Sequence, residues 1–447
     1  MRILLLNPPR SPENAILRHA PEDARPFIHR KLVGPPLGLL TVAAAVAEHE
    51  VRVFDMKGEY DLFPETPPAA ELAARLVREH APQIVGVTFI ASELPAGLEI
   101  LRAVKAAAPE AWTVAGGLHA TLCPSDFDDP AVDLVCVGPG AHAFREIVRA
   151  REKGTRLPDH IGGLWVRREG RLAPSAAPAA PVDPAGRDFF PPDRSQLARW
   201  LPSYVVGRAP GPSTYVFSSL GCPFRCSFCS IWPQTGGRYA ERTVESLLEE
   251  LKGLDDYPVV RFADANSLGN PALMDRLFDR ILAEGIRKFF IMDIRPDTAV
   301  RHPALMAKMA RGGLKVVISG FESFRSEELA GYGKNMGAES IEQAVRIFQD
   351  NGIIARGNYM VPPDYGEDDF QALAEHASRF PVELAGYTIL TPMPGTAYHE
   401  SVRDRIVDRD LSRYNFFNCV LKSRLPADEF HARVGALWRI RKGDWTV

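Results

Sequence analysis

Three closely spaced cysteines are the part of the sequence that points most directly to chemistry. The segment Ser218-Ser-Leu-Gly-Cys222-Pro-Phe-Arg-Cys226-Ser-Phe-Cys229 has the spacing C-x3-C-x2-C, whereas the other cysteines of the chain are scattered. Thiolates are the usual ligands of iron–sulfur clusters, and a short loop brings several of them to one inorganic core at little entropic cost. The segment therefore predicts a [4Fe-4S] cluster held by Cys222, Cys226 and Cys229, with one iron that has no cysteine ligand.

An iron without a protein ligand can chelate the amino and carboxyl groups of S-adenosylmethionine. An electron passed into the sulfonium then releases a 5'-deoxyadenosyl radical. A structural zinc site is one alternative, but zinc takes four ligands and no His or Cys follows Cys229 at finger spacing. Three buried structural thiols are the other alternative, and such crowding is unexpected in a chain with few cysteines.

The cysteine motif, with the aromatic Phe228 before its last thiol, resembles the radical S-adenosylmethionine superfamily. That family places the loop after the first strand of a partial (β/α)6 barrel. Phe262-Ala-Asp264-Ala-Asn266 is similar to the family's acidic strand end near the methionine moiety, and Gly320-Phe-Glu322-Ser323 to its Gly-x-Glu-Ser strand. The resemblance implies that S-adenosylmethionine contacts Phe228, Asp264, Glu322, Ser323 and Asn358.

Three of these polar residues, Asp264, Glu322 and Asn358, also have a structural alternative. Carboxylates at C-terminal strand ends can accept hydrogen bonds from an ammonium and from ribose hydroxyls. Asp264 could instead cap its loop, and Glu322 could form a structural ion pair, since single carboxylates are common. Arg356-Gly-Asn358 and Thr391-Pro-Met-Pro-Gly395-Thr396 follow late apolar runs, where rigid turns are the alternative.

The second half of the chain carries the elements that would position this site. Short apolar runs alternate there with helical stretches, which is typical of a barrel, complete or partial. The predicted strands are Tyr215 to Leu220, Val259 to Ala263, Phe289 to Met292, Val316 to Ser319, Ala355 to Val361 and Gly386 to Leu390.

The first 150 residues show a similar alternation. Apolar runs end at Asn7, Phe54, Phe89, Ala115 and Val137, with helix-like segments at Ala69 to His80 and Pro95 to Ala108 between them. Such alternation predicts right-handed crossovers and a parallel sheet covered on both faces. The predicted fold class is therefore α/β, with a doubly wound Rossmann-like domain followed by a partial (β/α)6 TIM-type barrel.

Composition divides the rest of the chain. Residues 151–205 combine a hairpin at Ile161 to Leu172, with its turn at Glu169-Gly170, and a linker rich in Ala and Pro at Ala173 to Pro192. The barrel is predicted over 206–420. In the tail, 421–447, apolar residues recur at helical spacing, which fits either a helix that closes the barrel or one that touches a membrane.

The first domain has several glycine-bearing strand ends. Gly138-Pro-Gly140 lacks the G-x-G-x-x-G pattern of dinucleotide binding. The segments at Asn7, Gly34, Gly116 and Asp133 instead resemble the cobalamin-binding domain of the cobalamin-dependent radical methylases. Glycines let backbone approach a flat corrin. The resemblance implies cobalamin contacts from Pro9, Gly38, Thr88, Gly116, Gly117, His119, Gly138 and Gly140.

Cobalt ligation by histidine is not predicted. The acidic strand end Asp55-Met-Lys57-Gly58 carries Lys where the Asp-x-His-x-x-Gly motif has His. His119 would hydrogen-bond a corrin amide or cap its own loop. Gly138-Pro-Gly-Ala-His142 also departs from the Gly-Glu-Gly-Glu of relatives.

Together the resemblances imply a cobalamin-dependent radical S-adenosylmethionine methyltransferase that methylates an unactivated carbon. The segments at Ser227, Arg261, Gly357 and Tyr414 resemble the hopanoid ring-A carbon methylases, which implies an apolar, polycyclic lipid substrate. An external electron donor of the flavodoxin or ferredoxin type is implied as well. Two alternatives remain open: a cyclase or rearrangement enzyme that uses cobalamin without methyl transfer, and a non-catalytic cobalamin sensor or carrier.

Composition limits the partners. With 46% hydrophobic and 24% charged residues and a formal net charge of −3, the chain gives no electrostatic case for binding nucleic acid. No apolar run approaches the ~20 residues that span a bilayer. Scattered cysteines fit a reducing compartment. We expect a cytoplasmic protein, with peripheral membrane contact left open.

Overall fold

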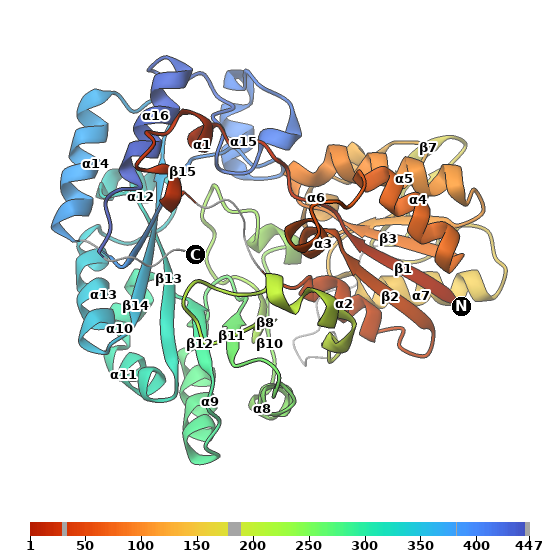
Figure 1. The fold of residues 1–447 in the computed structure, drawn as a ribbon, viewed down its shortest axis with the longest axis horizontal. Coiled ribbons are helices and arrows are strands. Elements are labelled where there is room, and N and C mark those ends of the chain that lie inside the picture. The colour runs from red at the N-terminus through yellow and green to blue at the C-terminus, as the bar shows by residue number, and fades with distance from the viewer. Residues whose placement is uncertain (29–33, 178–188, 381, 443–447) are drawn as a thin grey trace. The chain divides into compact units, whose positions relative to one another are not determined.

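The computed structural model describes residues 1–28, 34–177, 189–380 and 382–442, which form two compact units (Figure 1). The described residues of Met1–Ser11, Gly34–Tyr204 and Pro233–Ala240 make the first unit, and those of Pro12–Val33, Val205–Trp232 and Glu241–Val447 make the second. Domains predicted to end at residues 150, 205 and 420 are continuous in sequence, whereas these units interleave along the chain.

The first unit is built on a seven-stranded sheet with the order β2-β1-β3-β4-β5-β6-β7. Its strands are β1 (Arg2–Asn7), β2 (Glu50–Asp55), β3 (Ile84–Thr88), β4 (Trp112–Gly116), β5 (Leu134–Cys136), β6 (Leu164–Arg168) and β7 (Arg171–Pro174). Strands β2, β1, β3, β4 and β5 pair in parallel. Strand β6 pairs antiparallel with β5, and β7 pairs antiparallel with β6. The predicted doubly wound sheet is confirmed, and the predicted hairpin extends that sheet.

Helices follow the parallel strands of the first unit: α2 (Leu37–Ala44), α3 (Met56–Leu62), α4 (Ala69–His80), α5 (Leu94–Ala107), α6 (Leu118–Leu122) and α7 (Gly140–Glu152). In α4, Leu72, Ala73, Leu76 and Val77 are buried, which is the spacing of one helical face. The run Ile3 to Leu6 in β1 is buried throughout, as expected for a parallel strand covered on both sides. The predicted linker lies partly outside the described residues.

The order of the strands fixes where a ligand would bind in this unit. Strand β1 lies between β2 and β3, so the chain builds the sheet outward in both directions from β1. In such open α/β sheets the crevice at the carboxyl ends of the strands, where the direction reverses, is the usual ligand site.

The second unit holds a six-stranded sheet, order β15-β14-β13-β12-β11-β8, whose neighbours all pair in parallel. Its strands are β8 (Ser213–Val216), β11 (Val259–Phe262), β12 (Phe289–Asp293), β13 (Leu314–Glu322), β14 (Ile354–Val361) and β15 (Leu384–Ile389). The sheet does not close, since no bond joins β8 to β15 among the described residues. This is the predicted partial barrel.

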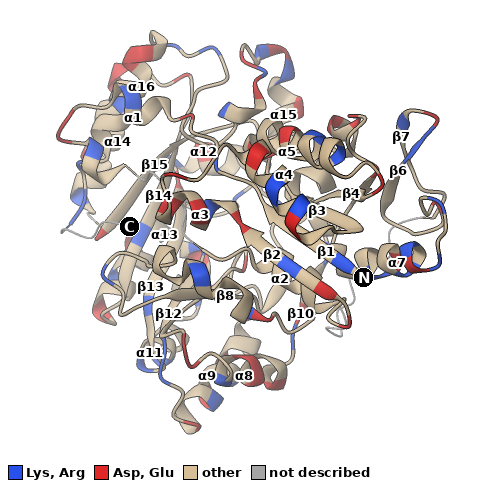
Figure 2. Ribbon diagram, turned by 45° about the vertical axis from the view of Figure 1, so that its right-hand side comes forward, with Lys and Arg blue, Asp and Glu red and all other residues tan. Residues whose placement is uncertain are grey.

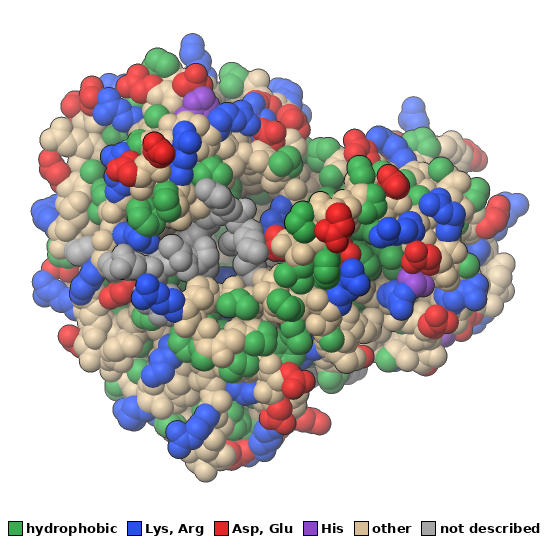
Figure 3. Space-filling view, viewed as in Figure 1, with side chains coloured by type: hydrophobic (Ala, Val, Ile, Leu, Met, Phe, Trp, Pro, Cys, Tyr) green, Lys and Arg blue, Asp and Glu red, His purple; other side chains and the backbone are tan. Residues whose placement is uncertain are grey.

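The helices of the second unit are α1 (Ala15–His19), α8 (Val244–Lys252), α9 (Pro271–Ala283), α10 (Pro296–Arg301), α11 (Pro303–Arg311), α12 (Ser326–Gly331), α13 (Glu339–Asp350), α14 (Glu367–Arg379), α15 (Ala397–Val402) and α16 (Ala427–Leu437). In Figure 2 the red and blue parts of the ribbon mark acidic and basic residues in α8 and α9, as expected for helices with one solvent-facing side. On the face shown in Figure 3, charges of both signs are interspersed. None of the described helices combines the length and the apolar character needed to cross a bilayer.

The two faces of the second sheet differ in chemistry. On one face Phe262 and Phe290 are fully buried, and Phe278 of α9 packs edge-on against Phe290. Because side chains alternate along a strand, Arg261, Asp293 and Arg356 lie on the opposite face, which we call the inner face. The inner face is therefore where polar groups of the barrel can meet a ligand.

Candidate active site

The cysteine loop begins where Asp264 anchors it. The carboxylate of Asp264 accepts hydrogen bonds from the backbone N–H of Ser218 (2.7 Å), the Ser218 hydroxyl (2.7 Å) and the N–H of Ser219 (3.1 Å). Asp264 is only 4% exposed, and burial raises its pKa to about 6 although these hydrogen bonds oppose the shift. The structure therefore gives Asp264 the role of a loop cap, and its contact with S-adenosylmethionine stays a prediction.

The three predicted cluster ligands lie together on this loop. A tight turn joins two of them, because the N–H of Cys229 donates to the carbonyl of Cys226 at 3.2 Å. The N–H of Ile231 donates to the Cys229 sulfur (3.4 Å), and an Arg295 Nη donates to the Cys226 sulfur (3.7 Å). N–H donors directed at sulfur are typical of iron–sulfur ligation.

Electrostatics of the loop also fit a metal cluster. Burial raises the pKa of Cys229 to about 11 and raises the pKa of Cys222 as well, and in both cases the neighbouring Cys226 adds to the shift. Thiols whose deprotonation is disfavoured in this way become thiolate ligands when they bind a metal, which supplies positive charge. The residues present therefore fit a cluster held by three cysteines.

Surrounding elements hold the loop rigidly. The Trp232 indole N–H donates to the Cys226 carbonyl (3.0 Å), and the backbone of Ser227 bonds both to the carbonyl of Tyr332 and to the N–H of Tyr398 (2.9 Å each). Phe228 packs edge-on against Tyr332, with ring centroids 5.7 Å apart. These contacts fix the position of Phe228 beside the thiols. Its predicted contact with S-adenosylmethionine is untested.

Glu322 ends strand β13 in a strained conformation. Its φ of 62° lies in the left-handed region, which is costly for a residue with a Cβ and is found mostly at functional sites. The carboxylate pairs with Lys334 at 2.7 Å, and Lys334, 3% exposed, also donates to the Gly320 carbonyl. The structural ion pair considered for Glu322 is therefore present, together with strain that a purely structural role does not require.

The other two predicted S-adenosylmethionine contacts differ from each other. Ser323 is 1% exposed and its hydroxyl donates to Glu328 at 2.5 Å, so the group is already engaged inside the protein. Asn358 lies on the inner face, two residues beyond Arg356 on β14 and in register with Gly386 of β15. Of the two side chains, Asn358 is the one placed to meet a ligand.

In the first unit, all the predicted cobalamin residues except Gly38 lie at or just after the carboxyl ends of β1, β3, β4 and β5. Gly117 has a φ of 95°, and a Cβ there would lie 2.6 Å from the Thr88 hydroxyl and 2.8 Å from the Phe89 nitrogen. Next to it, the N–H of Phe89 donates to the Gly116 carbonyl at 2.8 Å. The ends of β3 and β4 can approach this closely only because residue 117 is glycine.

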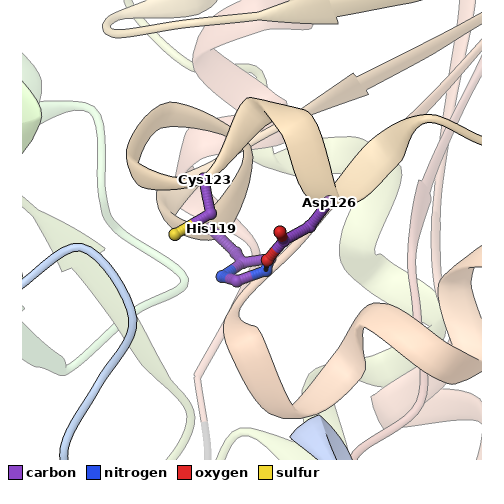
Figure 4. Close-up of side chains that lie close together, drawn as sticks. All are labelled: His119, Cys123 and Asp126. Atoms are coloured by element: carbon purple, nitrogen blue, oxygen red, sulfur yellow. Dashed lines mark ion pairs between the residues drawn. The ribbon is translucent and has the colours of Figure 1, made fainter. Parts of the chain in front are cut away.

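His119 is held within its own loop. The ring is 2% exposed, and its Nε2 lies 3.0 Å from a carboxylate oxygen of Asp126, while Cys123 stands on the other side of the ring (Figure 4). Ligand atoms of these three residues lie within 4.8 Å of one another. Nε2 makes no hydrogen bond of good geometry to any described residue despite this short distance, so the loop-capping role of His119 stays a prediction, and so does its contact with a corrin amide.

The remaining predicted cobalamin residues lie on loops or helix starts. Pro9 follows β1 and lines a cavity of about 350 Å³ together with Arg10, Lys57, Tyr60, Pro68 and Ala69. Gly138 has a φ of 87°, and its backbone N–H donates a hydrogen bond to the Thr121 hydroxyl at 3.0 Å. Gly140 begins α7, and Gly38 lies in α2, where an added Cβ would meet no atom within 4 Å.

Sequence reasoning missed Glu93, which lies beside this strand edge. Glu93 is 3% exposed and pairs with Lys57 at 2.5 Å. Burial raises the pKa of Glu93, and the positive charge of Lys57 opposes that shift. Glu93 could have been predicted from its position, because it is an acidic residue that follows the apolar strand ending at Thr88 by a few residues. Lys57, which stands where a histidine ligand would be, is thus committed to an ion pair.

Two families match the two units. Residues 27–148 match the B12 binding domain, and residues 216–377 match the Radical SAM superfamily. Among solved structures, the radical S-adenosylmethionine methyltransferase TsrM from Kitasatospora setae superposes with a TM-score of 0.70 at 19% identity, covering 90% of this chain and 76% of that one. The fold and the cysteine loop thus define a radical S-adenosylmethionine enzyme with a cobalamin domain.

Curated proteins with similar sequences align with this chain over most of its length. It is 29% identical to an uncharacterized methyltransferase of Pyrococcus horikoshii, over 90% of this chain and 83% of that protein. It is 24% identical to the hopanoid C-3 methylase of Methylococcus capsulatus (89% and 75% covered) and to the anaerobic magnesium-protoporphyrin IX monomethyl ester cyclase of a Synechocystis species (98% and 87%). The chain thus carries a B12 binding domain and a Radical SAM domain, which supports a [4Fe-4S] cluster, S-adenosylmethionine and cobalamin as its cofactors, and it is similar over most of its length to radical S-adenosylmethionine methyltransferases of the cobalamin-dependent type.

Proposed function

We propose that this enzyme transfers a methyl group to an unactivated carbon of an organic substrate. The observation that carries the proposal is the presence, in one chain, of a three-cysteine loop anchored at a barrel strand end and a doubly wound unit of the cobalamin type. When bound, the cluster supplies the electron that cleaves S-adenosylmethionine, and cobalamin supplies the methyl group.

The chain's own residues would bind and orient these groups. Cys222, Cys226 and Cys229 hold the cluster, and Asp264 keeps their loop in place through Ser218 and Ser219. Glu322 and Asn358 are the groups best placed to receive S-adenosylmethionine. In the first unit Gly116 and Gly117 provide the close backbone approach that a corrin requires. Phe228, Ser323, Pro9, Gly38, Thr88, His119, Gly138 and Gly140 complete the proposed contacts.

A polycyclic lipid is the first substrate to test, because the hopanoid C-3 methylase of Methylococcus capsulatus aligns with 89% of this chain. A flavodoxin or ferredoxin is the proposed electron donor. Ring formation without methyl transfer is the second candidate, and the match to the magnesium-protoporphyrin ester cyclase over 98% of the chain favours it.

Product analysis separates these functions. The protein is reconstituted without oxygen with iron, sulfide and cobalamin, and is incubated with S-adenosylmethionine, a reductant and lipid extract. Methyl transfer predicts both 5'-deoxyadenosine and S-adenosylhomocysteine, with one methyl added to a lipid in the mass spectrum. A cyclase would make 5'-deoxyadenosine without stoichiometric S-adenosylhomocysteine. A protein with a full cluster that makes neither product would be a sensor or carrier, and the proposal would fail.

A further inference from the structure

A layer of charged side chains crosses the inner face of the barrel, one level below the strand ends. Backbone register aligns Tyr215 of β8 with Arg261 of β11, and Asp293 of β12 with Ile318 and then Arg356 of β14. Arg261 donates to one Asp293 oxygen through Nη2 (2.9 Å) and Nε (3.3 Å). Two guanidinium groups, those of Arg261 and Arg356, therefore lie on the same face of the sheet as the single carboxylate of Asp293.

Arg356 is the guanidinium group of this layer that forms no ion pair among the described residues, whereas Arg261 pairs with Asp293. Its buried Nε has no hydrogen-bond partner among the described residues. Burial lowers the pKa of Arg356 to about 10, and the positive charge of Arg261 adds to that effect. The charge of Asp293 opposes this shift, but Arg356 shares that aspartate with Arg261. A largely buried guanidinium without a counter-charge of its own is costly, so such groups are usually paired or bind a ligand.

The neighbouring layers show from which side a ligand could come. Toward the amino ends of the strands, Val259, Ile291 and Val316 form an apolar cluster that Val206 and Ala209 cover. Toward the carboxyl ends, the inner face carries small residues, namely Ala263, Gly320 and Gly386, with Asn358 beside them. The charged layer is therefore closed below by apolar side chains, whereas above it the polar side chains of Glu322 and Asn358 lie against Gly320 and Gly386.

We propose that Arg356, together with the Arg261–Asp293 pair, binds an oxyanion of the substrate, either a carboxylate or a phosphate-type group. Guanidinium is suited to this role because its planar N–H groups match two oxygens of such an anion. The inference rests on the proposed function, since it requires a substrate on the inner face. It also narrows the class of substrate, because the ring system of a hopanoid carries no carboxylate or phosphate group.

Anion binding tests the proposal directly, with phenylphosphonate and benzoate as probes and benzyl alcohol as the neutral match. Titration calorimetry of the cluster- and cobalamin-loaded protein should show binding of the anions only. In Arg356→Met we expect the Kd for phenylphosphonate to rise at least tenfold, and in Arg356→Lys to rise less. Arg346→Met is the control, since that side chain on α13 is 71% exposed. Absence of binding to the unaltered protein, or equal binding to Arg356→Met, overturns the proposal.

S-adenosylmethionine carries a carboxylate of its own, so a second measurement identifies the source of the anion. If the substrate supplies it, Arg356→Met keeps its affinity for S-adenosylmethionine and its rate of 5'-deoxyadenosine formation within about twofold. A tenfold loss of that affinity would assign Arg356 to the cofactor and overturn the proposal. Thermal unfolding shows whether Arg356→Met is folded. If it is not, the same measurements are made with Arg356→Lys. S-adenosylhomocysteine is assayed separately, because its absence would contradict the methyl-transfer function and leave the anion result standing.

Discussion

Asp264 shows how one residue can prepare a metal site without touching the metal. Its carboxylate accepts three short hydrogen bonds from Ser218 and Ser219, which lie just ahead of the first cluster cysteine. These bonds fix the direction in which the chain leaves β8. The role is one of positioning, so changing Asp264 should affect cluster assembly through the loop.

Asp264→Asn keeps the size of the side chain but replaces one acceptor oxygen with an NH2 group that faces other donors. We expect a loss of about 1–3 kcal/mol in the free energy of unfolding at pH 7, with slower formation of 5'-deoxyadenosine. Urea unfolding and a product assay check these values. Asp279→Asn is the control, since Asp279 is 59% exposed and should change stability by less than about 0.5 kcal/mol.

The same residue predicts a pH dependence. The pKa of Asp264 is about 6 in the folded protein, against about 3.9 in an unfolded chain. The folded state therefore takes up the proton first, and the free energy of unfolding contributed by this group rises as pH falls from about 6.5 to about 4. The stability difference between the unaltered protein and Asp264→Asn should grow over that range. A difference that stays constant with pH would contradict the assignment.

The ion pair of Lys57 and Glu93 gives a second prediction at this scale. Lys57→Met leaves a carboxylate of 3% exposure without its cation, and removing one partner of a buried pair costs about 3–5 kcal/mol. Lys57→Met/Glu93→Gln should recover most of that loss, because no uncompensated charge remains. Unfolding in urea at pH 7 measures both variants. A cost below about 1 kcal/mol for the single variant would show that Glu93 is neutral or hydrated.

Among elements, the junction of β3, β4 and α6 depends on one glycine. In Gly117→Ala the new methyl group would lie 2.6 Å from the Thr88 hydroxyl, in a conformation with φ of 95°. We expect the free energy of unfolding to fall by about 2–4 kcal/mol, from backbone strain and overpacking together, with weaker cobalamin binding. Gly154→Ala is the matched control, because Gly154 also has positive φ but open space around it. Its cost should be about 1 kcal/mol. Equal losses in both variants would contradict the crowding argument.

Local patterns predicted most of the elements. Alternating apolar runs and helices identified both parallel sheets, and Ala69 to His80 is the helix α4 as predicted. Strand β13 is longer than predicted, because it continues from Ser319 to the strained Glu322. A left-handed residue at a strand end depends on tertiary contacts such as Lys334, and those are not visible in a local pattern. Within the tail predicted over 421–447, the structure places the helix α16, which ends at Leu437.

The site was predictable where its members are close in sequence. Cys222, Cys226 and Cys229 were identified from spacing alone. They lie on one loop, in which the N–H of Cys229 donates to the Cys226 carbonyl, and their role as cluster ligands stays a prediction. The partners of distant residues were not predictable: Ser323 is engaged by Glu328, and Lys57 by Glu93. The layer of Arg261, Asp293 and Arg356 was missed for the same reason, since it forms only when three strands come into register.

At the scale of the molecule, each unit has its own sheet and core, so a change in one should leave the ligand of the other in place. Cys226→Ala, in the second unit, is expected to lose the iron–sulfur absorbance and to reduce 5'-deoxyadenosine to background. Cobalamin absorbance should be retained after gel filtration. Cys419→Ala, outside the loop, is the control and should keep both. Loss of cobalamin from Cys226→Ala would contradict the assignment of the two cofactors to separate units.

The interleaving of the two units has a consequence for synthesis on the ribosome. Helix α1 packs on α16 in the second unit, and the N–H of Ala15 donates to Asn418, 403 positions later. At about 5–20 residues per second, α1 would emerge roughly 20–80 s before its partner. During that time Ile16, fully buried in the finished protein, has nothing to cover it. We expect nascent chains to depend on a chaperone over this interval, and any fragment cut between the two sheets to leave α1 without its partner.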